Sequence, residues 1–491
     1  MDTYFNELSI PTAAARSVGQ TKISGRIPLT RSVSKVYSAC GKAVITNTEV
    51  TDGKVLAEGK IILDIICKDT DDKYFSFSSS AAFSHTIDCE GAKPSMTAVV
   101  TAQLISIKTT LDGDNIDLDA VLDIMCRVED NGKKTMLSRK DNSTTEVKTM
   151  NVLYKQREKI GSSTVRLRED IVANDIKEVI YTGADALIRD ISSTLDNSRV
   201  DGILSLNALC VKKDGKLFKF QQNIPFTADV PIEGEKALSF SGKADVSDIK
   251  LRMTADEYGL ASLEAVLDVS VYSIAESELS LTTDAFSPQT AFDCIKRDMQ
   301  LLLFKESVEQ KTICHETVKM PDSTEKFKEA VFADVRPFVS SATKGENCII
   351  VDGIAFATLL YNDMQGELRS VTDELPFSLS IPTVYDNIEL DAKAVCTSAN
   401  ITGLTDEGVG ISMTIYITAD IFELCDTQIV ESVKSAEPVQ TKKGFVICFA
   451  SEGETCYDIA KRFNVSQSSL KEENKELQSV LRSGDKAVLF I

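Results

Sequence analysis

The sequence predicts a mainly β fold, with three repeated antiparallel β-sandwich or barrel-like units followed by a small βααβ domain. Three observations lead to this prediction. Two short motifs recur three times with the same spacings, each repeat closes with alternating apolar and polar residues, and the end of the chain changes to a strand, helix, helix, strand pattern. A length of 491 residues also favours several domains, because one hydrophobic core seldom serves more than about 300 residues.

Two anchors define the repeat. A glycine inside an apolar run recurs at intervals of 143 and 151 residues, and a downstream phenylalanine recurs at the same two intervals. Two anchors that keep one spacing indicate that a single structural unit has been triplicated. The glycines are Gly59, Gly202 and Gly353, and the phenylalanines are Phe83, Phe226 and Phe377.

Each unit ends in a strand-like run. In residues 118–126, 263–271 and 411–417 every second residue is apolar, and most intervening positions are Asp, Glu, Ser or Thr. This period of two predicts a half-buried antiparallel strand. Pairs such as Asp112-Gly113 and Asp214-Gly215 lie between apolar runs and predict hairpin turns, because glycine adopts positive φ at little cost. We expect five or six strands per unit around a single core.

Three segments have apolar residues at roughly helical spacing and predict short helices: residues 170–180, 289–306 and 323–331. The first and the last precede units two and three, where a helix would cover the edge of a sheet. The middle segment is expected to form a helical connector between units two and three, either as plain core or as a docking element.

The end of the chain carries the local signals of a compact module. Residues 446–449 predict a strand, Thr455-x-x-Asp458 fits a capping box that begins a helix, and Ser466 is placed to cap a second helix. Residues 487–491 predict the returning strand. A domain this small is marginally stable, so we expect it to pack against its neighbour or its partner. The side chains expected in its core are Ile459, Phe463 and Leu470.

Composition limits the classes of partner and the compartment. The net charge of −20 disfavours nucleic acid and anionic membrane surfaces, and it fits either a solvated acidic surface or a basic partner. None of the twelve cysteines is spaced as Cys-x-x-Cys, and several lie in apolar runs typical of buried free thiols. No signal peptide and no apolar stretch of about 18 residues is visible, so we expect a cytoplasmic protein without a membrane span.

Nothing in the sequence indicates catalysis, a metal or another cofactor. His85 and His315 are the two histidines, and Cys314-His315-Glu316 lacks a second pair of ligands at zinc spacing. No phosphate-binding loop of the type Gly-x-x-x-x-Gly-Lys-Ser/Thr occurs. We therefore expect a protein that is not an enzyme and has no catalytic residues, no metal and no cofactor.

Two stretches resemble known families. Residues 444–491 resemble a LysM domain, the small module that binds N-acetylglucosamine polymers in many proteins and protein partners in some. Val50–Lys60 and Phe83–Met96 resemble the SPOCS domain of spore-forming bacteria, which is often repeated and followed by a C-terminal LysM domain. Asp284–Ser287 is similar to the segment that closes such a unit.

This resemblance implies a non-enzymatic spore-coat assembly protein in the mother cell, at the forespore surface. There it would tether the coat by binding a coat ATPase similar to stage IV sporulation protein A through its LysM domain. The alternative is a protein that binds peptidoglycan or chitin oligomers. A LysM domain in the cytoplasm has no peptidoglycan to reach, which favours the protein partner.

Five residues of the LysM-like region are candidates for contact with a partner or a glycan. Many sugar-binding LysM sequences carry Pro-Gly-Asp-Thr and then Leu-Trp, whereas this chain has Glu452-Gly-Glu-Thr455 and then Cys456-Tyr457. The added acid and the missing Trp favour a protein partner. Some candidates also have a purely structural interpretation, as a turn, a helix cap or a helix end. The candidates are Gly453, Glu454, Thr455, Tyr457 and Asn474.

These observations divide the chain into eight parts. We expect an N-terminal segment at 1–24, SPOCS-like unit 1 at 25–130, a linker at 131–164, SPOCS-like unit 2 at 165–288, a helical connector at 289–312, SPOCS-like unit 3 at 313–430, a second linker at 431–443 and the LysM domain at 444–491.

Overall fold

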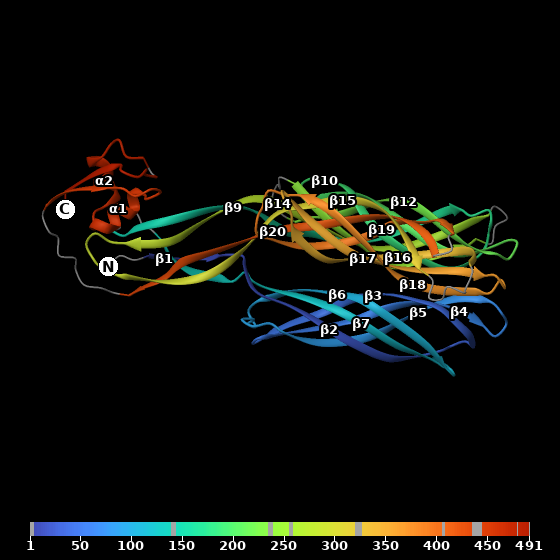
Figure 1. The fold of residues 1–491 in the computed structure, drawn as a ribbon. Helices are drawn as coiled ribbons and strands as arrows, with labels where there is room; N and C mark the ends of the chain where they lie inside the picture. Colours follow the sequence, from blue (N-terminus) through green and yellow to red (C-terminus); the bar gives the residue numbers. More distant parts are fainter. Residues whose placement is uncertain are drawn as a thin grey trace.

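The protein is mainly β and elongated, with a broad body at one end and a small domain at the other (Figure 1). Both chain ends lie near the small domain. The computed structural model describes residues 4–138, 144–233, 239–254, 259–319, 327–404, 408–434, 444–478 and 480–490.

The body consists of three units with one topology. In each unit the second, third and fourth strands form a three-stranded meander, while the sixth strand pairs with the first on one side and the fifth on the other. The two sheets of each unit enclose one apolar core. The predicted mainly β fold with three antiparallel sandwich-like units is confirmed, and the sheets do not close into barrels.

The strand bounds follow the repeat. Unit 1 contains β2 (Thr12–Pro28), β3 (Val33–Thr51), β4 (Lys54–Asp69), β5 (Tyr74–Asp88), β6 (Thr97–Asp112) and β7 (Asn115–Asp130). Unit 2 contains β9 (Glu146–Val172), β10 (Ile176–Ser193), β11 (Asn197–Lys212), β12 (Leu217–Pro231), β13 (Ser239–Met253) and β14 (Leu260–Phe286). Unit 3 contains β15 (Asp293–Lys319), β16 (Phe327–Lys344), β17 (Cys348–Asp363), β18 (Leu368–Pro382), β19 (Ile388–Leu404) and β20 (Gly408–Lys434).

The glycine and phenylalanine anchors are direct cross-strand partners in all three units. Gly59 pairs with Phe83, Gly202 with Phe226, and Gly353 with Phe377. Each ring lies over its glycine so closely that an added Cβ would stand 2.5, 2.4 and 2.1 Å from the ring Cζ in units 1, 2 and 3. The glycine is therefore required by close approach of the ring, and the triplication predicted from spacing is confirmed.

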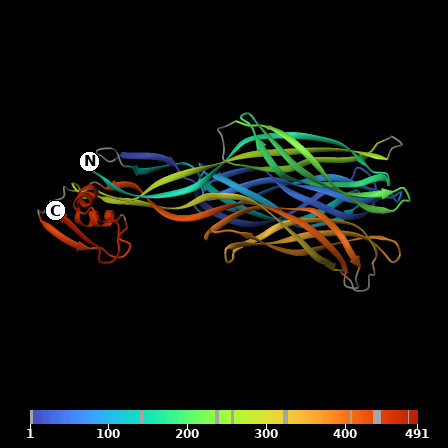
Figure 2. The ribbon, with the colours of Figure 1, turned by 90° about the horizontal axis from the view of Figure 1, so that it is seen from above.

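The three units form a closed ring around the long axis of the body. The fourth strand of each unit contacts the second strand of the next: β5 meets β10, β12 meets β16, and β18 meets β3. Equivalent apolar residues of all three units, including Ile66, Leu209 and Leu360, share one buried cluster where the units meet. Seen along the perpendicular view in Figure 2, units 2 and 3 flank unit 1. The body thus has an approximate threefold arrangement within one chain.

A stalk of three β-ribbons joins the body to the small domain. The ribbons are β1 (Tyr4–Ser9) with β8 (Lys133–Ser138), and the ends of the long pairs β9–β14 and β15–β20. Residues from all three ribbons share an apolar cluster. Unit 3 also meets unit 1 here, because Leu301 of β15 bridges Thr12 of β2. The cluster contains Ile10, Met136, Leu279, Leu281, Leu301, Leu303 and Ile429.

The helices predicted in the body are wrong. Residues 289–306 fall largely in β15, which pairs with β20 along its whole length, so the connector expected at 289–312 is not helical. Residues 170–180 contain the end of β9, a turn and the start of β10. Residues 323–326 of the third segment lie outside the described residues, and the remainder begins β16. Residues 131–164, expected to form a linker, contain β8 and much of β9.

The error at β15 has a physical cause. Leu301–Phe304 is a continuous apolar run that is buried on both faces, because one face packs in the stalk cluster and the other against neighbouring strands. A strand buried on both faces loses the period of two, and a short apolar run of this kind does not distinguish a strand from a helix. The tertiary pairing with β20 decides the outcome.

Candidate functional site

The small domain begins its first helix with the predicted capping box. Thr455 precedes α1 (Cys456–Phe463); its Oγ1 accepts from the Asp458 backbone N–H at 3.3 Å, and the Asp458 carboxylate accepts from the Thr455 N–H at 3.0 Å. Burial disfavours the charged form of Asp458, but hydrogen bonds from Thr455 and Lys148 outweigh it and lower the pKa of this carboxyl. The helix start is therefore firmly fixed.

The rest of the domain folds as the pattern predicts. Ser466 caps α2 (Gln467–Glu473), and strands β21 (Phe445–Phe449) and β22 (Lys486–Phe490) form an antiparallel pair. One face of this pair packs on the two helices. The resulting core includes Cys448, Ile459, Ala460, Leu470, Ala487 and Leu489, with Phe463 packed against it.

The domain packs directly on the stalk through α1. The Tyr457 ring, only 4% exposed, meets the ring of Phe286 edge-on, with 5.3 Å between centroids. Lys148 of β9 donates to Asp458 at 3.0 Å, and Lys461 forms an ion pair with Asp284. Because one aromatic contact and two ion pairs join α1 to the ends of β9 and β14, this face of the helix is already covered.

The five predicted contact residues do not share one surface. Gly453 is exposed in a turn at φ +77°, with open space around its Cα. Glu454 pairs with Arg462 and accepts from the Ser451 N–H at 2.9 Å. Tyr457 lies against the stalk. The turn that contains Gly453 and Glu454 bonds through its backbone to Leu481, so these residues and Thr455 line one end of the domain.

Asn474 lies at a different place, beside β22. Its amide nitrogen donates to the carbonyls of Leu470 and Val488 at 2.8 and 2.6 Å, and its amide oxygen accepts from the Val488 N–H at 2.7 Å. All these contacts are internal, so the side chain ties the end of α2 to the edge of β22. A role in contact with a partner or glycan stays a prediction for all five residues.

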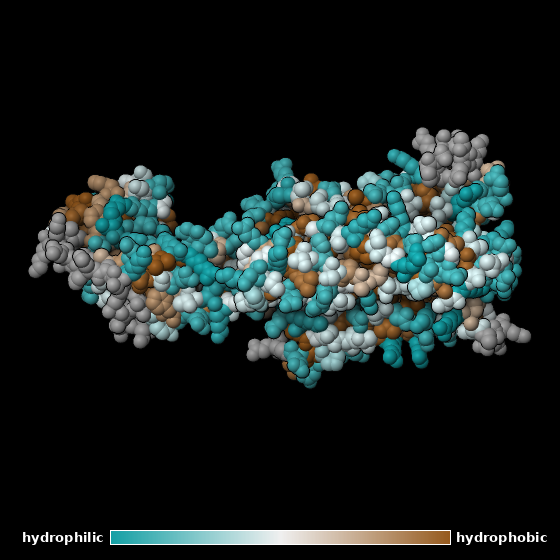
Figure 3. All heavy atoms as spheres, turned by 90° about the horizontal axis from the view of Figure 1, so that it is seen from below, coloured by the Kyte–Doolittle hydropathy of each residue, from teal (hydrophilic) through white to brown (hydrophobic). Residues whose placement is uncertain are grey.

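Sequence reasoning missed an exposed apolar face on the other side of the β21–β22 pair. Its side chains are partly or mostly accessible, and Figure 3 shows hydrophobic surface on the small domain beyond the narrow waist of the molecule. The sequence contains a run of five apolar residues here, which predicts a strand. It does not show which face of that strand stays exposed. The exposed members are Phe445, Ile447, Phe449 and Phe490.

A partly open cavity of about 1960 Å³, lined by both polar and apolar groups, lies between the three units of the body. Lys42, Asp185 and Arg336, which occupy equivalent positions in the three units, all line it. Asp185 is accessible from the cavity, and its enclosure among the three units raises its pKa despite nearby Arg336 and Lys393. Burial also lowers the pKa of Lys219, on the wall of the cavity, to about 8. Both signs of charge are present, so the lining does not select one class of ligand.

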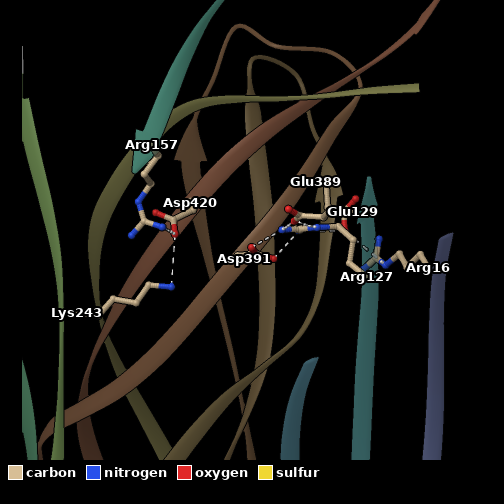
Figure 4. A network of polar contacts seen from close by, with 8 residues as sticks. All are labelled: Arg16, Arg127, Glu129, Arg157, Lys243, Glu389, Asp391 and Asp420. Atoms are coloured by element: carbon tan, nitrogen blue, oxygen red, sulfur yellow. Dashed lines mark hydrogen bonds and ion pairs between the residues drawn. The ribbon is translucent and has the colours of Figure 1, made fainter. Parts of the chain in front are cut away.

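Buried ion pairs beside the cavity join the units (Figure 4). Arg127 of unit 1 binds both carboxylate oxygens of Asp391 in unit 3, at 2.7 and 2.8 Å, and also reaches Glu389 at 3.3 Å. Arg157 of unit 2 pairs with Asp420 of unit 3 at 3.2 Å. These contacts hold the ring together and leave Arg127 nearly inaccessible, at 6% side-chain exposure.

The described residues form neither a metal site nor a membrane-spanning helix. No group of three or more His, Cys, Asp or Glu side chains is arranged to hold a metal ion in that part of the chain. No helix among these residues has the length and apolar character needed to cross a membrane. All twelve cysteines are free thiols.

Comparison with known families identifies two regions. Residues 32–112 match the family model described as SipL, SPOCS domain, and residues 451–486 match the LysM domain. The SPOCS match covers β3 to β6 of unit 1, and the LysM match covers both helices of the small domain. No curated protein and no solved structure matches the chain. The chain therefore combines a SPOCS domain with a C-terminal LysM domain, as the sequence resemblance implied.

Proposed function

We propose that this protein is a non-enzymatic assembly factor of the spore coat, which uses its LysM domain to capture a coat ATPase similar to stage IV sporulation protein A. It acts in the mother cell and tethers the coat to the forespore surface. The observation that carries the proposal is the pairing of a SPOCS domain from a sporulation family with a LysM module in one chain.

The geometry supports a scaffold role. The three units pack through a shared apolar cluster and buried ion pairs, which gives the body a fixed form. The LysM domain is presented at the far end of the stalk (Figure 1), and the outer face of its sheet is exposed. Both matched domain families are non-catalytic, which supports a role in binding rather than in chemistry. We retain the three SPOCS-like units and the terminal LysM domain as the proposed functional division of the chain.

Co-purification tests the proposal. The full chain and a chain that ends at residue 434 are each immobilised and offered the stage IV sporulation protein A homologue of the source organism. We expect capture by the full chain and loss of capture without the LysM domain. The melting transition of the body serves as the control for folding. Undiminished capture by the shortened chain would show that the LysM domain is not the contact.

Binding of N-acetylglucosamine oligomers is the second candidate function. It is favoured by the family of the matched module, since LysM domains are of the peptidoglycan-binding type, and by the exposed turn at Gly453 with Val480, 58% exposed, close to it. Calorimetric titration with chitooligosaccharides tests it. Micromolar affinity would support this function, whereas millimolar or no binding would remove it.

A further inference from the structure

The outer face of the LysM sheet is apolar and open. Phe445, Ile447 and Phe449 alternate along β21 with 57, 44 and 64% exposure, and Phe490 of β22 is 62% exposed. Phe490 is the cross-strand partner of Phe445, and their ring centroids are 5.4 Å apart. These side chains form one continuous patch because alternate residues of a strand share a face and cross-strand partners are adjacent.

The two edges of this sheet differ. At the outer edge of β22, Asn474 bonds to the N–H and C=O of Val488, and Glu473 accepts from the Phe490 N–H at 3.2 Å. Side chains of α2 therefore cap that edge. Val488 pairs with Ile447, and Phe490 pairs with Phe445. In an antiparallel ladder, when the N–H and C=O of one residue point away from the neighbouring strand, those of its cross-strand partner point to the opposite outer edge.

It follows that the N–H and C=O groups of Phe445, Ile447 and Phe449 point to the free edge of β21. No other strand of the described residues pairs with this edge. The residues whose side chains form the apolar face thus also offer the unpaired main-chain groups. Native proteins usually protect such an edge with charge, proline or a bulge, yet Phe445-Val-Ile-Cys-Phe449 contains no charge and no proline. An open segment of this composition is prone to aggregation unless something covers it.

We propose that a segment of a partner protein adds as a β-strand to the free edge of β21 and lays alternate apolar side chains on Phe445, Ile447 and Phe449. This mode of recognition takes affinity from main-chain hydrogen bonds and specificity from alternate side chains. The proposal rests on the proposed function, because it locates the contact with the coat ATPase on the LysM domain.

Charge defines the partner segment further. Lys486, cross-strand partner of Phe449, is the charged residue on this face, and Lys442 and Lys443 precede β21 in the sequence. An apolar face that carries Lys486 at one end is complementary to an apolar strand with an acidic residue at the matching end. One face of α1 is already occupied by the stalk, and the outer face of the sheet carries most of the exposed large apolar side chains among the described residues of this domain.

Two sheet variants and one matched control test the proposal in the full chain, with the stage IV sporulation protein A homologue as probe. Phe449→Asp places a charge on the face, and Ile447→Pro removes an outward N–H without removing a bond to β22. Val384→Asp makes the same kind of change at an apolar residue of the body that is 83% exposed. We expect each sheet variant to weaken capture at least tenfold and Val384→Asp to change it less than twofold.

Hydrogen exchange gives a readout that does not depend on the folding of variants. With ¹⁵N-labelled phenylalanine and isoleucine, the amides of Phe445, Ile447 and Phe449 should exchange freely in the isolated chain and at least tenfold more slowly in the complex. Unchanged exchange of all three amides in a complex that forms would overturn the proposal.

The remaining outcomes separate this inference from the proposed function. If the chain ending at residue 434 fails to capture the ATPase while both sheet variants, shown to be folded by their melting transitions, capture it normally, the proposed function stands and the strand-addition site is wrong. If the shortened chain captures the ATPase normally, both are wrong. A dimer of the isolated chain that Phe449→Asp dissociates would show that the occupant is a second copy of this chain and would also overturn the proposal.

Discussion

At the scale of single residues, the packing of each unit depends on the glycine that allows a phenylalanine ring to lie on the backbone. Gly202→Ala should destabilise unit 2 by roughly 2–4 kcal/mol, because the new Cβ would stand 2.4 Å from Phe226 Cζ and 2.7 Å from the Leu187 carbonyl oxygen. Thermal unfolding measures the loss. Gly25→Ala is the matched control, since nothing lies within 4 Å of its Cβ position in β2. Equal effects of the two changes would contradict the packing role.

A second residue-scale prediction concerns Lys219, whose Nζ donates to the Ala399 carbonyl of the neighbouring unit. Burial lowers the pKa of Lys219 in the folded state to about 8, from 10.5 in the unfolded chain. Between these two pH values the unfolded chain binds more protons than the folded chain. The contribution of Lys219 to the stability of the folded state therefore rises with pH in this range. Lys219→Met removes this dependence. The stability of the variant relative to the original chain should therefore fall by roughly 1–3 kcal/mol between pH 7 and pH 10. If the difference in stability between the variant and the original chain is the same at pH 7 and pH 10, the pKa of Lys219 is not lowered in the folded state.

Sequence patterns predicted these residue-scale features unevenly. The spacing between the glycine and the phenylalanine reflects the register of two neighbouring strands in one unit. This pairing could therefore be inferred from the sequence. Thr455 with Asp458 was also readable, because a helix cap depends on contacts three residues apart. Tyr457 was not, since its partner Phe286 is distant in the sequence and belongs to another domain.

At the scale of elements, α1 makes the contacts that attach the LysM domain to the stalk. Tyr457→Ala should weaken this attachment, because it removes the aromatic contact with Phe286. Ile459 and Leu470 remain in the core of the domain and keep it folded. Hydrogen exchange at the end of β14, residues 282–286, should become faster, and the helical signal of the domain should persist. Loss of that helical signal would show that Tyr457 supports the fold of the domain itself.

A strand segment buried on both faces is one of the elements that the sequence described incorrectly. Alternation predicted the sixth strand of each unit, because one face packs on a core and the other is more polar. The stalk part of β15 lacks alternation, since Leu301–Phe304 is buried on both sides. In β21 the opposite occurs: an apolar run suggests burial, while the structure leaves one face open.

At the scale of the whole molecule, the ring of three units could not be read from the repeat. Spacing fixes pairing within a unit, whereas the ring depends on contacts between units such as that of Arg127 with Asp391. Arg127→Met should destabilise the body by about 3–5 kcal/mol, because it removes the buried guanidinium that pairs with Glu129, Glu389 and Asp391. Arg168→Met, which breaks the exposed pair with Glu264, should cost less than about 1 kcal/mol. Similar melting temperatures for the two variants would contradict the role of Arg127 in closing the ring.

The central claim is that a three-unit scaffold is held at its place of action by the LysM domain at its tip. Fluorescence microscopy of sporulating cells of the source organism tests this claim most directly, with the full chain and the chain ending at residue 434 carrying the same fluorescent label. We expect the full chain to encircle the forespore and the shortened chain to spread through the mother cell at equal abundance. A shortened chain that still encircles the forespore would contradict it.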